Sequence, residues 1–137
     1  MIKEIIKDDF FLKQKSVEAD QNDLYIIDDL LDTIKKYNDS CVGMAANMIG
    51  YLKRIIVVLD GNEYLVLINP EIMKCFGSPY TTEEGCLSHQ GTKPTKRYSK
   101  IKVFYFDKNM KKKIKTFDGF TAQIIQHEID HLNGILI

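Results

Sequence analysis

The segment from His127 to His131 reads HEIDH and matches the H-E-x-x-H pattern of metal-dependent hydrolases. Apolar residues at helical spacing predict a helix over 120–132 that carries this segment. Because residues four apart share one side of a helix, the imidazoles of His127 and His131 can reach the same cation. Glu128 can then take a proton from a water molecule that the cation has made more acidic. An ordinary amphipathic helix with two surface histidines is the alternative explanation.

A catalytic ion of this kind needs about three protein ligands and one open position. After His131 the sequence offers only one polar side chain, Asn133, so we expect the third ligand upstream. Cys86 is the best placed candidate, because nearby glycines and a proline indicate a bent strand or loop that can direct a side chain. Three other residues remain alternatives, namely His89, Cys41 and Cys75. Of these, Cys75 fits a strand or core position better.

The first half of the chain contains patterns typical of one helix and one β-hairpin. Leucines and isoleucines at helical spacing predict an amphipathic helix over 24–37. The runs 55–59 and 64–68 are typical of strands, and Asp60-Gly61-Asn62 between them predicts a hairpin turn. Asn69-Pro70 is expected to end the second strand, because proline cannot donate a ladder hydrogen bond.

The second half adds another hairpin before the metal-binding pattern. A strand is predicted over 101–106 and a short partner around 114–117, with a polar turn between them. We interpret the lysines at 111–113 and Lys115 as a solvated hairpin tip, because no aromatic residue is interleaved with them on the loop. A helix, several strands and a final helix, in that order, indicate an α+β fold.

The composition favours one globular domain over residues 1–137, with 45% apolar and 28% charged residues and no linker. The 19 basic and 19 acidic residues cancel, which leaves no overall charge to attract nucleic acid or an anionic membrane. No apolar run is long enough to span a bilayer, and Asp8 and Asp9 interrupt the stretch where a signal peptide would be apolar. We therefore expect a cytoplasmic protein whose three cysteines are thiols.

Three motifs resemble the peptide deformylase family: VGMAA at 42–46, EGCLS at 84–88 and QHEIDHLNG at 126–134. Shorter similarities extend the resemblance over roughly residues 24–137, namely RIIVV (54–58), LINPEI (67–72), Arg97 and IKVFYFD (101–107). The resemblance implies a single deformylase-like domain over residues 1–137. Its fold would be α+β, with small antiparallel sheets wrapped around a C-terminal metal-binding helix.

The resemblance also implies a reaction. The protein would remove the formyl group from the N-terminal formyl-methionine of nascent polypeptides and release formate, with metal-bound hydroxide as the nucleophile. Glu128 would be the general acid/base, and the backbone N–H of Leu87 would help to stabilise the oxyanion. One divalent ion would be held by Cys86, His127 and His131. Ferrous iron would be the ion in the cell, and zinc, nickel or cobalt could replace it, since a thiolate with two imidazoles suits all of them.

The substrate cleft is implied by the same family likeness. The peptide backbone would bind as an added strand along Val42, Gly43, Gly85 and Ser88. The methionine side-chain pocket would be bordered by Phe120, Gln123 and Ile124. Two further substrate-binding residues would be Met48 and Arg97. The residues expected to support the metal ligands from behind are Glu84, Gln126 and Asp130. We expect N-formylated nascent peptides near the ribosome as partners of a monomer, with no membrane and no direct nucleic-acid site.

The chain departs from the family pattern in its first motif, which usually reads G-x-G-x-A-A-x-Q. Here Cys41 replaces the leading glycine and Met48 replaces the glutamine, whose amide donates a hydrogen bond to the oxyanion in the family. A thioether has no donor, and losing one such donor costs about 10² to 10³ in turnover. His89-Gln90 also replaces the usual apolar residue and proline. The alternatives are a slow deformylase, a donor supplied by Asn47 or Gln90, or a protein that acts on another N-acyl substrate or only binds.

Overall fold

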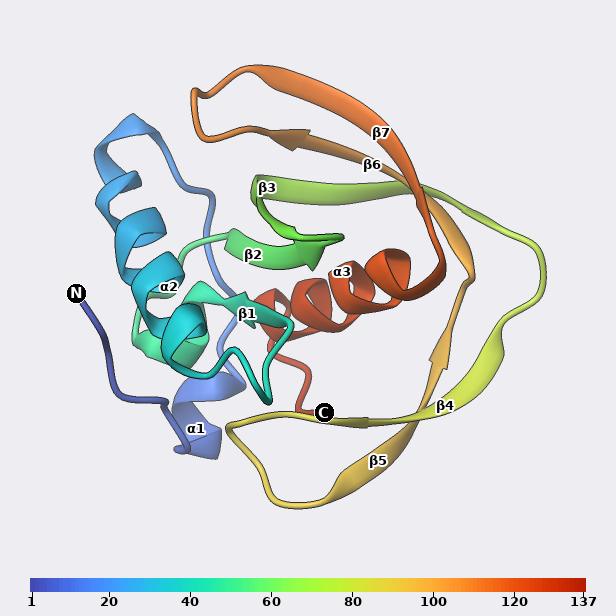
Figure 1. Cartoon of the computed structure of the whole chain (residues 1–137), viewed down its shortest axis with the longest axis horizontal. Coiled ribbons are helices and arrows are strands. Elements are labelled where there is room, and N and C mark those ends of the chain that lie inside the picture. Colours follow the sequence, from blue (N-terminus) through green and yellow to red (C-terminus); the bar gives the residue numbers. More distant parts are fainter.

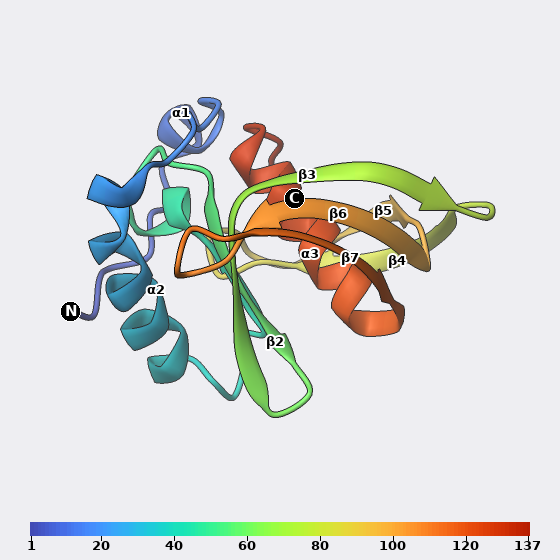
Figure 2. The ribbon, with the colours of Figure 1, turned by 90° about the horizontal axis from the view of Figure 1, so that it is seen from above.

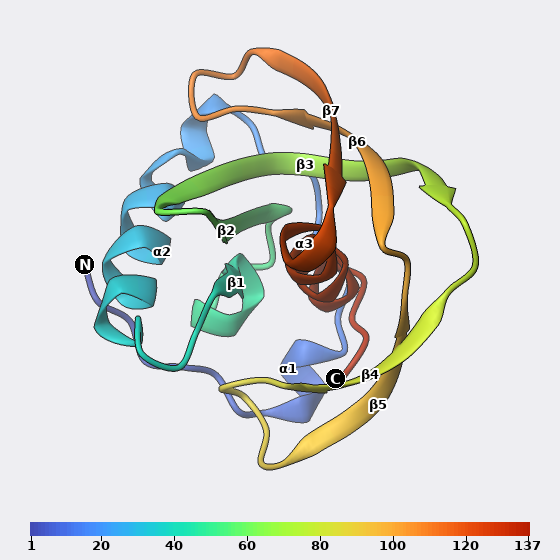
Figure 3. The same ribbon diagram turned by 45° about the vertical axis from the view of Figure 1, so that its right-hand side comes forward.

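The computed structural model describes residues 1–137, which form two antiparallel sheets that curve around a C-terminal helix (Figure 1). This helix, α3, runs from Gly119 to Leu132. The larger sheet has the strand order β1-β2-β3-β6-β7, with the bounds Gly43–Ala45, Ile55–Asp60, Glu63–Phe76, Lys100–Phe106 and Lys112–Asp118. The smaller sheet pairs β4 (Tyr80–Gly85) with β5 (Thr92–Arg97). Figure 3 shows strands on several sides of α3, so the expected α+β arrangement is confirmed.

The N-terminal part of the chain supplies the helices beside the larger sheet. The predicted helix is confirmed as α2 (Tyr25–Lys36), and its fully buried Ile26, Leu30 and Ile34 share one face. α2 and α3 both pack against β2, which explains why the four consecutive residues Ile55–Val58 are buried. Three short helices were not predicted, because each is too short to show a periodic pattern: α1 (Asp9–Leu12), η1 (Gln21–Asp23) and η2 (Ala46–Ile49).

The hairpin of β2 and β3 forms as predicted, but its second strand does not end at Asn69-Pro70. β3 continues to Phe76, and its register with β6 shifts between Ile68 and Glu71. Asn69 adopts a left-handed backbone conformation with φ of 52°. Its side-chain oxygen accepts from the Ala19 N–H at 2.8 Å, and its side-chain nitrogen donates to the Ala19 carbonyl at 2.9 Å. The strand therefore accommodates the proline in a β-bulge.

α3 lies inside the fold and is buried on most of its surface. Its apolar side contributes Ala122, Ile125 and Leu132 to the core, all of them fully buried. Its other side buries polar residues as well, namely Gln126, His127, Glu128 and His131. Since buried polar groups need hydrogen bonds or an ion, this side of α3 is where a site is expected. None of the helices combines the length and the apolar character that crossing a membrane requires.

Candidate metal centre and active site

Three side chains from two elements converge beside α3. One ligand atom each from Cys86, His127 and His131 lies within 4.8 Å of the others. The two histidines are one helical turn apart on α3, as the spacing predicted. Cys86 follows the last residue of β4, and its carbonyl accepts a hydrogen bond from the His89 N–H at 3.1 Å, which turns the chain back toward β5. The structure therefore brings the three predicted ligands together.

The alternative ligands lie elsewhere. Cys75 is exposed on β3, so it is in a strand but does not fill the core. His89 forms a hydrogen bond through Nε2 with Oδ1 of Asp9 at 2.9 Å. Cys41 borders the cavity, where its thiol donates to the Gly43 carbonyl at 3.0 Å. Burial, with a contribution from the nearby carboxylate of Glu128, raises the pKa of Cys41 to about 12, so this thiol keeps its proton.

The spacing of the donor atoms fits a divalent ion. The Nε2 atoms of His127 and His131 face each other at 3.1 Å. Tetrahedral bonds of about 2.0–2.1 Å from zinc would hold two imidazole nitrogens roughly 3.3 Å apart. A thiolate beside two imidazoles is also a ligand set that several first-row transition metals accept. The three residues therefore fit a catalytic site that leaves one position open.

The two histidines have opposite protonation tendencies. Burial would lower the pKa of His127, but hydrogen bonds with Cys86 and Glu84 outweigh it and raise the pKa to about 10. Burial and the adjacent charge of His127 lower the pKa of His131 to about 3. Without a metal ion, the two imidazoles therefore carry one positive charge between them, on His127. A cation bound beside Cys86 would take the place of that charge.

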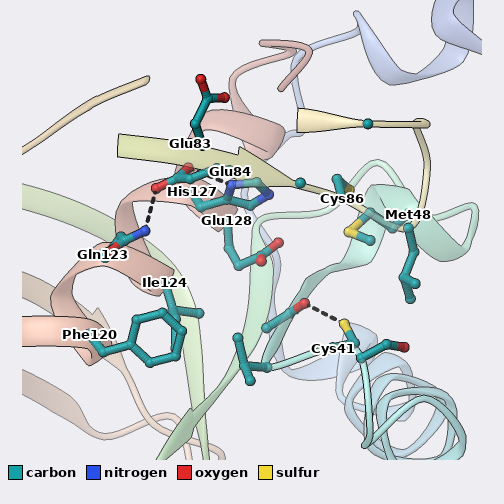
Figure 4. Close-up of a pocket in the computed structure, with 16 residues that line it drawn as sticks. Cys41, Met48, Glu83, Glu84, Cys86, Phe120, Gln123, Ile124, His127 and Glu128 are labelled. Carbon is teal, nitrogen blue, oxygen red and sulfur yellow. Dashed lines mark hydrogen bonds and ion pairs between the residues drawn. The ribbon is translucent and has the colours of Figure 1, made fainter. Parts of the chain in front are cut away.

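A chain of buried charged groups orients the ring of His127. Its Nδ1 lies 2.8 Å from Oε1 of Glu84, which leaves Nε2 directed at the ligand cluster (Figure 4). Arg97 donates to both oxygens of the Glu84 carboxylate, at 2.7 Å from Nη2 and 3.0 Å from Nε, and to Asp130 at 2.7 Å. Burial would raise the pKa of Glu84, but the hydrogen bonds from His127 and Arg97 lower it to about 2. Glu84 is thus held as a carboxylate behind the ligand.

This network changes the interpretation of Arg97. Its side chain is only 5% exposed and binds Glu84 and Asp130, and it does not line the cavity as a substrate-binding residue would. Gln123 is linked to the same carboxylate, since its Nε2 donates to Oε2 of Glu84 at 3.0 Å. Gln126 instead pairs with the backbone of Tyr98, so it joins α3 to the end of β5 rather than supporting a ligand.

The side chain of Glu128 packs very close to Gly43 of β1. A Cβ atom added at Gly43 would lie 2.8 Å from Oε2 of Glu128 and 2.5 Å from Cγ2 of Ile124, so a larger residue would displace the carboxylate. Burial raises the pKa of Glu128 to about 7, although the charge of His127 opposes this shift. A carboxyl group with a pKa near neutrality can both accept and donate a proton.

A cavity of about 480 Å³ opens beside these groups (Figure 4). Most of the predicted cleft residues line it, namely Val42, Gly43, Met48, Gly85, Leu87, Phe120, Gln123 and Ile124. Ser88 does not, because its side chain is buried in the loop after Cys86. Three other lining residues were not among the predicted cleft residues, and each lies next to one of the named residues on an exposed segment: Ser40, Glu83 and Gly91.

Comparison with known proteins decides the family. The sequence profile of the family described as polypeptide deformylase matches residues 2–137. The chain belongs to this deformylase family. A peptide deformylase of Clostridium beijerinckii is 56% identical over 137 residues, which is 100% of both chains.

Solved deformylase structures share the fold. The class I type b peptide deformylase from Acinetobacter baumannii with bound Met-Ala-Ser has a TM-score of 0.90 and 31% identity, over 99% of this chain and 97% of that one. Its actinonin complex gives 0.90 and 33%, over 99% and 95%. The Thermotoga maritima deformylase gives 0.89 and 31%, over 99% and 95%. The family predicted from the three motifs is therefore confirmed.

This deformylase site departs from the family motif on the side where an oxyanion would form. The N–H of Leu87 makes no hydrogen bond within the chain, so it is free to donate into the cavity. Met48 stands where the deformylase motif has its glutamine, and its thioether offers no donor. Asn47 does not replace that donor, because it is fully buried outside the cavity lining and its amide nitrogen donates to the His131 carbonyl at 2.9 Å. Gln90 is exposed and does not line the cavity.

Proposed function

We propose that this chain is a metal-dependent deformylase that removes the formyl group from N-terminal formyl-methionine and releases formate. The observation that carries the proposal is the convergence of three elements on one cavity. These are the ligand trio of Cys86, His127 and His131, of which the first two line the cavity, the buried carboxyl group of Glu128 and the free N–H of Leu87. A relative with this fold is seen with bound Met-Ala-Ser, which is a peptide with the N-terminus that deformylation would produce.

A divalent ion held by the trio would supply Lewis acidity, which lowers the pKa of a coordinated water toward neutrality. We propose ferrous iron as the ion in the cell, with zinc, nickel or cobalt as substitutes. The ligand chemistry supports all four, since it combines a soft thiolate with two imidazoles.

Glu128 would carry the proton through the reaction. Its carboxylate accepts a proton from the attacking water and passes it to the leaving amine, for which a pKa of about 7 is well suited. The N–H of Leu87 donates to the oxygen of the formyl carbon as negative charge develops on it. The network of Glu84 and Arg97 keeps the His127 ring in one orientation during these steps.

The substrate would bind between two free strand edges. β1 is the last strand of its sheet and β4 pairs only with β5, so each offers unpaired backbone groups near the cavity. An extended peptide can add to such edges through main-chain hydrogen bonds. Its methionine side chain would enter the part of the cavity bordered by Phe120, Gln123 and Ile124. We further propose that the chain is one domain over residues 1–137 and that it works as a monomer in the cytoplasm, near the ribosome.

The test measures formate release from formyl-Met-Ala-Ser together with bound metal, on protein purified without oxygen. We expect about one divalent ion per chain and formate release that a chelator abolishes. Because Met48 lacks a donor, formate release by the parent protein should be slow. The variant Met48→Gln is therefore assayed beside it, since its restored donor should make the activity easier to detect. Bound metal with no formate from either protein would refute the deformylase assignment. Absence of metal under these conditions would refute the whole proposal.

A further inference from the structure

The outer face of the larger sheet is uncovered along β3, β6 and β7. Side chains alternate across a strand, so the fully buried Ile101 and Val103 of β6 point toward α3, and Lys100, Lys102 and Phe104 point away from it. Seen from above, no helix lies over this part of the sheet (Figure 2). We call this surface the outer face and define it by Lys74, Phe76, Lys100, Lys102, Phe104 and Lys112.

The lysines of the outer face are not neutralised within the protein. Lys74 of β3 lies directly opposite Lys102 of β6, a like-charge pairing that destabilises a sheet. None of the four lysines of this face forms an ion pair, whereas Lys113 and Lys115 on the same hairpin bind Asp107 and Asp60. Two carboxylates share the face without pairing to its lysines, Glu71 opposite Phe104 and Asp118 opposite Lys100. The lysines outnumber them, so the outer face attracts anions.

The lysines 111–113 and Lys115 do not form the predicted hairpin tip, because all of them except Lys111 lie in β7. The lysines of the outer face also have aromatic rings between them, although the sequence from 111 to 115 contains none. The ammonium groups of Lys74 and Lys100 lie 4.9 and 5.3 Å from the centre of the Phe76 ring. Phe104 is half-buried and meets Phe106 edge-on, with ring centres 5.6 Å apart. The rings come from β3 and β6, and only the strand pairing brings them beside the lysines. Interleaved cations and aromatic rings are the combination that binds a phosphate backbone and stacks on bases.

We propose that the outer face binds single-stranded RNA. The ammonium groups of Lys74, Lys100, Lys102 and Lys112 contact phosphates, and an unstacked base packs against Phe104. An acidic protein would use the same charges, and the second experiment below distinguishes it from RNA through the stacking of a base on Phe104. The surface lies outside the cavity, so RNA binding does not depend on the proposed reaction and can be tested apart from it.

The first experiment measures the dissociation constant for a fluorescent 12-nucleotide oligouridylate at several salt concentrations. Lys74→Gln/Lys102→Gln should weaken binding by about tenfold at low salt and reduce the slope of log affinity against log salt by about 1.4, because about 0.7 counterions are released per phosphate contact on a single strand. The matched control is Lys35→Gln/Lys36→Gln on α2. It removes the same charge, and it also includes a lysine beside an aromatic ring, since Lys36 lies over Tyr37.

The second experiment separates stacking from charge. Phe104→Leu keeps an apolar side chain of similar bulk but removes the aromatic face, and it should weaken oligouridylate binding at least about fivefold with an unchanged salt slope. Formate release from a short peptide should stay at the parent level in all of these variants, which checks their folding. Equal weakening in the control pair, or poly-glutamate competing as well as RNA with no effect of Phe104→Leu, would overturn the proposal.

Discussion

The two sides of the candidate site are held in very different ways. On the metal side, His127 and His131 lie on the enclosed helix α3, and Glu84 and Arg97 orient the first ring through buried, charged hydrogen bonds. On the loop side, the segment 86–91 is tied to the rest of the fold by far weaker contacts. One of them joins His89 to Asp9, whose side chain is 58% exposed.

Every departure from the deformylase motifs lies on or beside the loop side. Met48 lies near Cys86 (Figure 4), Cys41 lines the same cavity, and His89-Gln90 follow Cys86 in the loop. The metal side keeps its two histidines, its glutamate and its ion-pair network, and Cys86 is the one ligand that the loop side supplies. Removing one member of a buried charged network leaves the others unpaired and costly, whereas a loosely held loop tolerates substitution. The difference teaches that substitutions around the two histidines should be costly to metal binding, whereas substitutions around the loop should mainly change the catalytic rate.

The largest effect should come from removing the proton carrier on the metal side. Glu128→Gln keeps the shape of the side chain but cannot accept a proton, so kcat for formate release should fall about 10³-fold. Bound metal, measured by elemental analysis, should be unchanged, because Glu128 is not among the converging ligand atoms. Activity within tenfold of the parent would instead mean that another group moves the proton.

The loop side should respond in the opposite direction. Met48→Gln supplies the donor that the thioether lacks, and we expect kcat to rise about tenfold to a hundredfold, somewhat less than the full effect of one oxyanion donor. The side chain is only 1% exposed, so the new amide needs the oxyanion as its partner. Met48→Leu is the control, since it is equally apolar and should leave the rate unchanged. A rate that does not distinguish Gln from Leu would show that no oxyanion forms beside this residue.

The network behind His127 should affect metal affinity rather than rate. Glu84→Gln removes the charge that orients the ring and leaves Arg97 without its main partner, so the metal dissociation constant should rise about 10- to 100-fold. Glu83→Gln is the matched control, because this neighbour on β4 is exposed and makes no ion pair. Competition with a metallochromic chelator measures both. Similar affinities for the two variants would contradict a role for Glu84 in holding the ligand.

The features predicted correctly from the sequence depend on local spacing. The helix carrying His127 and His131, the helix over 24–37 and both hairpins follow from periodicity and turn residues that lie close together in the chain. The resemblance added Cys86, which spacing alone left among several alternatives, and the structure brings it to the two histidines.

The features that the sequence did not reveal depend on distant contacts. β3 passes through Asn69-Pro70 because the asparagine side chain pairs with the backbone of Ala19. The resemblance implies a substrate-binding role for Arg97, but the fold pairs this residue with Glu84 and Asp130 instead. No local pattern encodes such partners, since they are distant along the chain and meet only when the sheets close around α3.

The smallest effect should come from the link between the loop and α1. Asp9→Asn weakens the only side-chain hydrogen bond of His89, and an exposed pair of this kind contributes at most about 1 kcal/mol, so kcat should fall about threefold with little change in metal affinity. The family usually has proline at position 90, and the N–H of Gln90 makes no hydrogen bond that a proline would break. Adding Gln90→Pro to Asp9→Asn should therefore stiffen the loop and restore the rate. If the double variant stays slow, or if Asp9→Asn loses metal as Glu84→Gln does, the two sides of the site are not held independently.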